Sequence, residues 1–194
     1  IIISLVIPVY GVEKYIEEFA RSIFSQACPS VQFVFVNDGT KDSSITVLEN
    51  LIDSQYSHLR DRIVIVNKEN GGLPAARKTG LEHAEGDYIY HVDPDDWLSE
   101  GSFEAILEKI RQTEADLIFF NYVKEYENRS SIKKEYPYEV SQKDTYIRNM
   151  YNHRAFGTLC NKCVRRSLYD GIFHPKYSYA EDCYLSVQLA ARAE

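Results

Sequence analysis

The sequence lacks any long apolar run, and no stretch approaches the roughly 18 uncharged residues that a membrane-spanning helix needs. Basic residues are also few, because 22 lysines and arginines stand against 29 aspartates and glutamates, for a formal net charge of -7. Domains that bind nucleic acids usually carry a basic surface, so this balance argues against that class of partner. The 194 residues and 44% hydrophobic content suit one globular α/β domain with a sizeable core.

Cysteine is scarce as well, with four residues in the chain. Cys160 and Cys163 have the spacing of a zinc-binding pair, but no second pair follows. We therefore expect reduced and mostly buried thiols in a cytosolic protein. Residues 1–3 have no basic leader and no cleavage pattern, so they predict a strand and not a signal peptide.

Several nucleotide and metal motifs are absent. Neither the P-loop pattern G-x-x-x-x-G-K-[ST] nor the dinucleotide pattern G-x-G-x-x-G occurs near Asn70-Gly71-Gly72. An EF-hand beginning at Asp93 is excluded, because Leu98 stands where the calcium loop needs glycine. An aspartyl-phosphate phosphatase is excluded too, because Val36 stands where its nucleophilic aspartate would be.

Short β-branched runs alternate with amphipathic patterns over the first 120 residues. The expected strands are residues 4–9, 31–36, 62–66, 87–92 and 115–120, and the expected helices are residues 13–26, 43–56, 74–83 and a segment from about residue 100. This alternation predicts right-handed βαβ units in a three-layer α/β/α sandwich with a mainly parallel central sheet. The C-terminal part is less regular: residues 122–138 predict irregular structure or a hairpin, and residues 142–151 and 181–191 predict helices.

Polar and turn-forming residues stand where the first four strands end. They are Pro8-Val9-Tyr10, Asn37-Asp38-Gly39-Thr40, Asn70-Gly71-Gly72 with Arg77 shortly after, and Asp93-Pro94-Asp95-Asp96. The carboxyl ends of parallel strands meet at one edge of a sheet, where ligands bind, so we expect these groups to converge. The glycines in the third group allow a ligand to approach the backbone closely.

Each group also has a plain structural interpretation when taken alone. Residues 93–96 would be a solvated helix start, residues 37–40 a tight turn, and Arg77 a surface arginine. The pair Glu181-Asp182 would be the acidic first turn of the last helix. The alternative for residues 93–96 is a divalent cation held by one or two aspartates, with positions left open for phosphates, as in Mg²⁺ or Mn²⁺ sites.

Taken together and in order, these groups resemble the family 2 glycosyltransferases with the GT-A fold, and the resemblance continues to Glu181-Asp182. It implies a single catalytic domain over residues 1–194, with a Rossmann-like nucleotide-sugar-binding half in residues 1–120 and an acceptor-side region in residues 121–194. The chain ends twelve residues after Asp182, where relatives commonly continue. The resemblance therefore implies an acceptor-side region that is partial and truncated at its C-terminus.

The resemblance also implies a role for individual residues. The nucleotide would be bound by Pro8, Tyr10, Asp38, Gly72, Arg77 and Asp93, with Pro8 and Tyr10 lining the base pocket, Asp38 bonded to the base and Asp93 facing the ribose.

For the chemistry, the resemblance implies that Asp95 coordinates Mn²⁺ or Mg²⁺ at the diphosphate and that Asp182 is the catalytic base. Asp96 is expected to be structural, as a helix cap or a hydrogen-bond acceptor.

The implied function is transfer of a sugar, most often from a UDP-sugar, to a hydroxyl of a carbohydrate or lipid-linked acceptor with inversion. The expected setting is surface polysaccharide assembly in the cytoplasm, at the inner membrane through segments outside this chain. A sugar-phosphate nucleotidyltransferase is one alternative, but residues 11–14 are not the glycine- and arginine-rich loop that it needs. A non-catalytic nucleotide-binding module is another, against which the set of Asp38, Asp95 and Asp182 argues.

Overall fold

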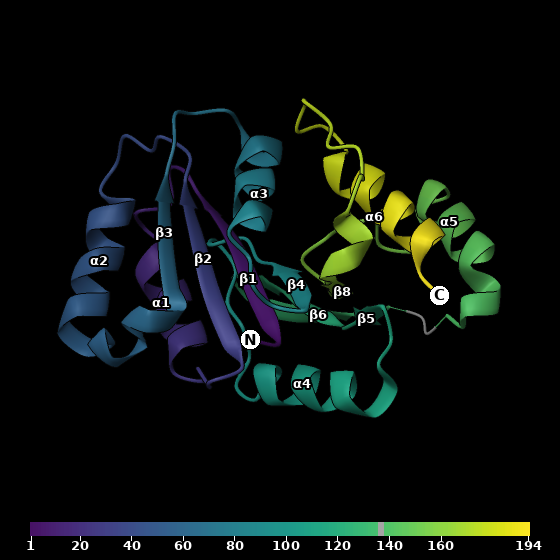
Figure 1. The fold of residues 1–194 in the computed structure, drawn as a ribbon, viewed down its shortest axis with the longest axis horizontal. Coiled ribbons are helices and arrows are strands. Elements are labelled where there is room, and N and C mark those ends of the chain that lie inside the picture. Colours follow the sequence, from purple (N-terminus) through teal and green to yellow (C-terminus); the bar gives the residue numbers. More distant parts are fainter. Residues whose placement is uncertain (136–137) are drawn as a thin grey trace.

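A six-stranded sheet forms the centre of the protein in the computed structural model, which describes residues 1–135 and 138–194 (Figure 1). Its strand order is β3-β2-β1-β4-β8-β5. These strands are β1 (Ile3–Val9), β2 (Val31–Asn37), β3 (Ile63–Asn67), β4 (Tyr88–His91), β5 (Leu117–Phe119) and β8 (Lys162–Arg165). Strands β1 to β4 pair in parallel, and β8 runs antiparallel between β4 and β5. The prediction of a mainly parallel sheet is confirmed.

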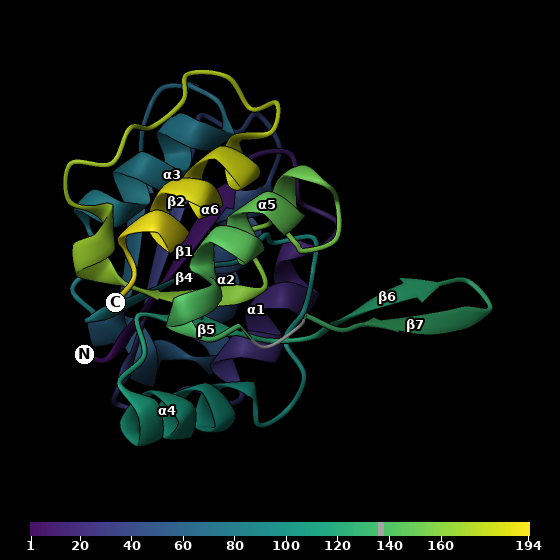
Figure 2. The ribbon, with the colours of Figure 1, turned by 90° about the vertical axis from the view of Figure 1, so that its right-hand side faces the viewer.

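Helices cover both faces of the sheet, which confirms the three layers (Figures 1 and 2). The helices are α1 (Ile16–Phe24), α2 (Ser44–Gln55), α3 (Leu73–Glu82), α4 (Ser102–Thr113), α5 (Lys143–Tyr151) and α6 (Glu181–Arg192), with short 3₁₀ helices η1 (Ser57–Arg62), η2 (Val140–Gln142) and η3 (Arg166–Tyr169). Side chains alternate along β2: Phe33 and Phe35 join the core beneath α1, α2 and α4, whereas Val34 and Val36 pack against α3. Both faces of a parallel strand are therefore apolar, as the continuous hydrophobic run predicts.

A two-stranded hairpin projects from the body of the protein (Figure 2). It consists of β6 (Tyr122–Tyr126) and β7 (Arg129–Lys133), paired antiparallel. The hairpin alternative for residues 122–138 is thus confirmed for the strands, while residues 136 and 137 of that range lie outside the described residues.

Strand β8 was not predicted, because it is short and its pattern is unusual. It has four residues and includes the charged side chains Lys162 and Arg165. Its pairing comes from tertiary context, since Cys163 stands opposite Tyr90 of β4 and Ile118 of β5. No local periodicity of the sequence carries that information.

The sheet opens at its carboxyl edge between β1 and β4. Their pairing stops at Val6 and His91, although β1 continues beside β2 as far as Val9. Pro8 has no N–H to donate, and it fits in a central strand because it lies beyond the end of this pairing. After Val92, whose N–H donates to the Val6 carbonyl at 3.1 Å, the acidic residues leave the sheet.

Gly80 is where α3 lies closest to the sheet. A Cβ at this position would collide with Cγ1 of Val6 and stand 3.3 Å from Cγ2 of Val36. Alanine favours an exposed helix over glycine by about 1 kcal/mol, but overpacking a core costs about 1–3 kcal/mol. We expect Gly80→Ala to lower the free energy of unfolding by up to about 2 kcal/mol, measured by urea denaturation.

Val6→Ala removes the colliding methyl group and supplies the control. The double variant Val6→Ala/Gly80→Ala should lose less stability than the sum of the two single variants. A Gly80→Ala protein that is more stable than the parent would contradict the close packing of α3 on β1.

Candidate active site

The predicted site residues gather at the carboxyl edge of the sheet. Asp38 follows β2, Asp93 follows β4, Arg77 lies in α3, and Asp182 lies in the first turn of α6. Hydrogen bonds and ion pairs arrange them in two groups, one around Asp38 and one around Arg77.

Asp38 fastens the loop before α3 to the end of β2. Its Oδ1 accepts a hydrogen bond from the Gly71 N–H at 2.9 Å, and its Oδ2 accepts one from the Gly72 N–H at 2.8 Å. Lys68 Nζ also pairs with Oδ1 at 2.5 Å, and Asp38 is only 3% exposed. Gly72 has φ +83°, a conformation that favours glycine. The structural-turn interpretation therefore holds, and a carboxylate oxygen that accepts one bond can still accept a second from a ligand.

The two residues expected to line a base pocket differ in exposure. Pro8 is buried in β1, whereas Tyr10, just beyond the strand, is 54% exposed. The N–H of Gly11 donates to Thr40 Oγ1 at 2.9 Å, so the loop after β1 lies beside the turn after β2. Tyr10 thus offers a free aromatic face at this edge, and Pro8 offers little surface.

Arg77 is fully buried among carboxylates, so the surface-arginine interpretation is wrong. It is 1% exposed, and its Nη2 donates to Asp93 Oδ1 at 2.9 Å. Its Nη1 donates to both Glu181 Oε1 and Asp182 Oδ1. Burial alone would lower the pKa of Arg77, but the negative charges of Asp182, Asp93 and Glu181 raise it above its usual value.

Glu181 belongs to this group, although no separate role is predicted for it from the sequence. It is 2% exposed, and among the described residues its Oε2 has no hydrogen-bond partner. Burial raises the pKa of Glu181 to about 7, although the neighbouring Arg77 lowers it in part. This environment arises because the first turn of α6 meets Arg77 of α3, so the residue pattern could not reveal it.

Asp182 is the more accessible member of the acidic pair, with 28% of its side chain exposed. Its Oδ1 faces Arg77, and its Oδ2 accepts a hydrogen bond from the Leu159 N–H at 3.4 Å. The helix-start interpretation also holds, because both acidic residues lie in the first turn of α6. The carboxylate is therefore held in place while part of it stays open to a substrate.

Lys162 fixes the loop that contacts Asp182, and sequence reasoning missed it. It is 1% exposed, and its Nζ donates to the carbonyls of Phe156 at 3.1 Å and of Thr158, and to Asn161 Oδ1 at 2.8 Å. Burial lowers the pKa of Lys162 to about 8. No signal in the sequence distinguishes this lysine from a surface one.

The acidic run after β4 supplies oxygen ligands suited to a divalent cation. Ligand atoms of Asp93, Asp96 and Cys160 all lie within 4.8 Å of one another. Burial raises the pKa of Asp93, and Arg77 offsets part of that rise. Carboxylate oxygens are the ligands that Mg²⁺ and Mn²⁺ prefer, so the aspartates fit such an ion, and the thiol would suit a softer one.

The structure bears on the roles expected for Asp95 and Asp96 in this run. Asp95, the expected metal ligand, is exposed and lies outside the cluster of three, and its role stays a prediction. Asp96 does not cap a helix, because α4 begins at Ser102 with Gly101 in the cap position. The structural role expected for Asp96 as a cap is therefore wrong.

All four cysteines are free thiols, which confirms that part of the expectation. Only Cys163 is buried, and the other three are partly exposed, so the expectation of mostly buried thiols is wrong. Cys163 points into the main core and Cys160 lies at the acidic cluster, so the two do not act as a zinc pair.

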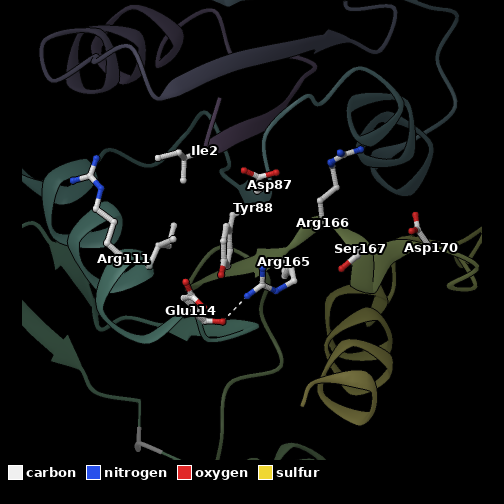
Figure 3. A pocket seen from close by; sticks show the side chains of 10 residues that line it. Ile2, Asp87, Tyr88, Arg111, Glu114, Arg165, Arg166, Ser167 and Asp170 are labelled. Atoms are coloured by element: carbon white, nitrogen blue, oxygen red, sulfur yellow. Dashed lines mark hydrogen bonds between the residues drawn. The ribbon is translucent and has the colours of Figure 1, made fainter.

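A separate cavity of about 550 Å³ lies at the opposite end of β4. Figure 3 shows Tyr88, Arg165 and Arg166 among the residues that line it. Because Tyr88 begins the strand and Asp93 follows its end, this cavity is distinct from the carboxylate group.

Within the described ranges, no helix has both the length and the apolar character needed to cross a membrane.

The raised pKa of Glu181 predicts a pH-dependent stability. A carboxyl group whose pKa is higher in the folded state stabilises the fold at low pH and loses that contribution as the pH rises toward about 7. Glu181→Gln stays neutral, so its unfolding free energy should rise relative to the parent between pH 5 and pH 8 in urea titrations. Glu104→Gln, at an exposed position of α4, is the control and should show no such trend. A Glu181→Gln difference that is equal at both pH values would contradict a protonated Glu181.

Comparisons with known proteins agree with this architecture. The chain is 31% identical over 169 residues to the putative glycosyltransferase EpsH of Bacillus subtilis, a match that covers 86% of this chain and 47% of EpsH. It is 37% identical over 120 residues to the glycosyltransferase GlyA of Streptococcus pneumoniae, covering 62% of this chain and 16% of GlyA. The chain thus spans about half the length of EpsH and a smaller part of GlyA.

Two solved structures share the fold. The crystal structure of S. aureus TarS 1-349 in complex with UDP matches all of this chain and 56% of the 1-349 chain, with a TM-score of 0.81 and 22% identity. The mannosyltransferase PcManGT from Pyrobaculum calidifontis, in complex with GDP-Man and Mn²⁺, matches 94% of this chain and 50% of its own, with a TM-score of 0.65 and 17% identity. The family model described as "Glycosyl transferase family 2" matches residues 4–173. This chain therefore belongs to glycosyltransferase family 2 and has the GT-A fold.

Proposed function

We propose that this protein transfers a sugar from a nucleotide-sugar donor, of the UDP-sugar class, to a hydroxyl of a saccharide or lipid-linked acceptor with inversion. The observation that carries the proposal is the shared contact of Asp93 and Asp182 with Arg77, which brings a carboxylate from the β4 edge to one from α6. Family membership supports the transferase activity.

The donor is proposed to bind across the carboxyl edge of residues 1–120. Tyr10 would stack on the base with Pro8 beneath it, since Tyr10 has an exposed ring. Asp38 and Gly72 form the turn that would receive the edge of the base, and Asp93 would hydrogen-bond the ribose. TarS crystallised with UDP and with UDP-GlcNAc shares this fold, which supports a uridine donor.

Asp95 is the proposed ligand of Mn²⁺ or Mg²⁺, with Asp93 and Asp96 close by. The aspartate oxygens fit such an ion, and the Mn²⁺ in the PcManGT structure supports a metal in this fold. A bound divalent cation would stabilise the negative charge that develops on the departing diphosphate.

Asp182 is the proposed base, in residues 121–194 on the acceptor side. The acceptor oxygen forms a bond to the anomeric carbon while the bond from that carbon to the diphosphate breaks, and its electron pair stays on the diphosphate. Asp182 takes the hydroxyl proton. One carboxylate acting on one face implies a single displacement, and therefore inversion.

The proposed setting is surface polysaccharide assembly on the cytoplasmic side of the membrane. Relatives named for this kind of work support it, such as the minor teichoic acid biosynthesis protein GgaB of B. subtilis, 40% identical over 107 residues, which cover 54% of this chain and 11% of GgaB. Family membership favours a transferase over a nucleotidyltransferase. Measured turnover separates an enzyme from a nucleotide-binding module.

Metal-dependent UDP binding tests the donor half of the proposal. We expect UDP to raise the melting temperature with Mn²⁺ and to lose this effect in EDTA, because binding to the native state stabilises it. Asp95→Ala should weaken UDP binding in calorimetry by about tenfold or more, since roughly 1.4 kcal/mol is tenfold. Asp96→Ala tests whether the clustered aspartate contributes, and exposed Asp144→Ala is the control. UDP affinity that is unchanged by EDTA and by Asp95→Ala would remove the metal role.

Asp182→Asn tests the proposed base. Release of UDP from the nucleotide sugar that stabilises the chain best should fall about 10²–10⁴-fold, which is the usual contribution of a general base. UDP affinity should stay within about twofold, because none of the proposed donor contacts involves this side chain. Asp144→Asn is the matched control. Undiminished UDP release by Asp182→Asn would exclude Asp182 as the base.

A further inference from the structure

Arg77 is placed poorly for a nucleotide ligand. Its side chain is 1% exposed, and both Nη atoms already donate to carboxylates. Its Nε is buried and has no hydrogen-bond partner among the described residues. A base or phosphate that bonded to either Nη would compete with Asp93, Glu181 or Asp182. Displacement would leave a partly buried carboxylate without its cation, which is unfavourable.

The partners of Arg77 come from separate parts of the chain. Asp93 lies in the loop after β4, which is the donor edge, and Asp182 lies in the first turn of α6, beyond residue 120. Arg77 itself belongs to α3, which packs on β1 and β2. A guanidinium has a rigid planar fork of donors, so it can hold two carboxylates in a fixed relation that a flexible ammonium cannot.

Charge within the group favours the two aspartates as the ionic partners. Glu181 is the most buried carboxyl of the three, and burial raises its pKa to about 7. Asp182 and Asp93 also contribute more than Glu181 to the raised pKa of Arg77. His91 does not compete with Arg77 for the carboxylates, because burial and the charge of Arg77 lower the pKa of His91 well below its usual value and keep the ring neutral.

We infer that Arg77 is a positioning residue that clamps Asp182 to Asp93 and does not contact the nucleotide. The clamp fixes the first turn of α6 at the donor edge, so the base stands at a set place relative to the sugar. This inference rests on the proposed function for the role of Asp182. Its distinguishing consequence is that loss of Arg77 harms turnover far more than donor binding.

The test compares Arg77→Ala and Arg77→Lys with Lys78→Ala, an exposed neighbour on the same helix. Misplacing a catalytic group by about 1 Å can cost 10²-fold in rate, so we expect Arg77→Ala to slow UDP release by about 10²-fold. UDP affinity should fall by no more than it falls in Asp93→Ala, because Asp93 is the one proposed donor contact that Arg77 holds in place. Added methylguanidinium should restore turnover in a saturable way, whereas ammonium should not. Lys78→Ala should match the parent.

Hydrogen exchange supplies a readout that does not depend on the substrate. Amides in the first two turns of α6 should exchange about tenfold faster without Arg77, while those of β2 keep their protection. If Arg77→Ala does not fold, Arg77→Lys is the deciding variant, because it keeps the positive charge but lacks the planar guanidinium. It should also show faster exchange in α6 and lower turnover.

Two results would overturn the inference. One is a loss of UDP affinity as large as the loss of turnover, which would make Arg77 a nucleotide ligand. The other is unchanged exchange in α6 of the folded Arg77 variants. A parent chain that neither binds UDP nor releases it from any nucleotide sugar would instead refute the proposed function, and the α6 exchange would still decide whether the clamp exists.

Discussion

The contact of one buried arginine with three carboxylates is the interaction on which this site depends. Arg77 reaches from α3 to Asp93 at the end of β4 and to Glu181 and Asp182 at the start of α6. Without the cation, carboxylates would be left partly buried beside one another, and like charges in a low dielectric repel strongly. The regular βαβ half and the less regular C-terminal region therefore meet through an ionic contact at the proposed site, in addition to the pairing of β8 with β4.

The sheet prepares this contact by separating its two central strands. Strand β4 ends its pairing with β1 at His91, and the residues that follow carry Asp93 away from the sheet. The turn held by Asp38 closes the other side, where it draws the glycine loop before α3 against the end of β2. The close packing of α3 on the sheet at Gly80 then fixes how near to the sheet the side chain of Arg77 begins. Backbone geometry thus determines where the charges stand.

Local sequence patterns predicted most of the layers and the edge at which the polar groups meet. Continuous apolar strands such as β2 and the amphipathic spacing of α1 are strong signals, since burial on both faces or one face dictates them. Strand β8 and the burial of Glu181 and Lys162 were missed, because each depends on segments that are distant in sequence. The residue types indicated a site, but the three carboxylate partners of Arg77 could be identified only from the fold.

The most direct measurement is a crystal structure of this chain with UDP and Mn²⁺. The account predicts uridine against the exposed ring of Tyr10 and the turn of Asp38, the ion at the aspartates after β4, and Arg77 still paired with Asp93 and Asp182. A structure in which Arg77 leaves Asp182 and binds the base or the phosphates would contradict the account.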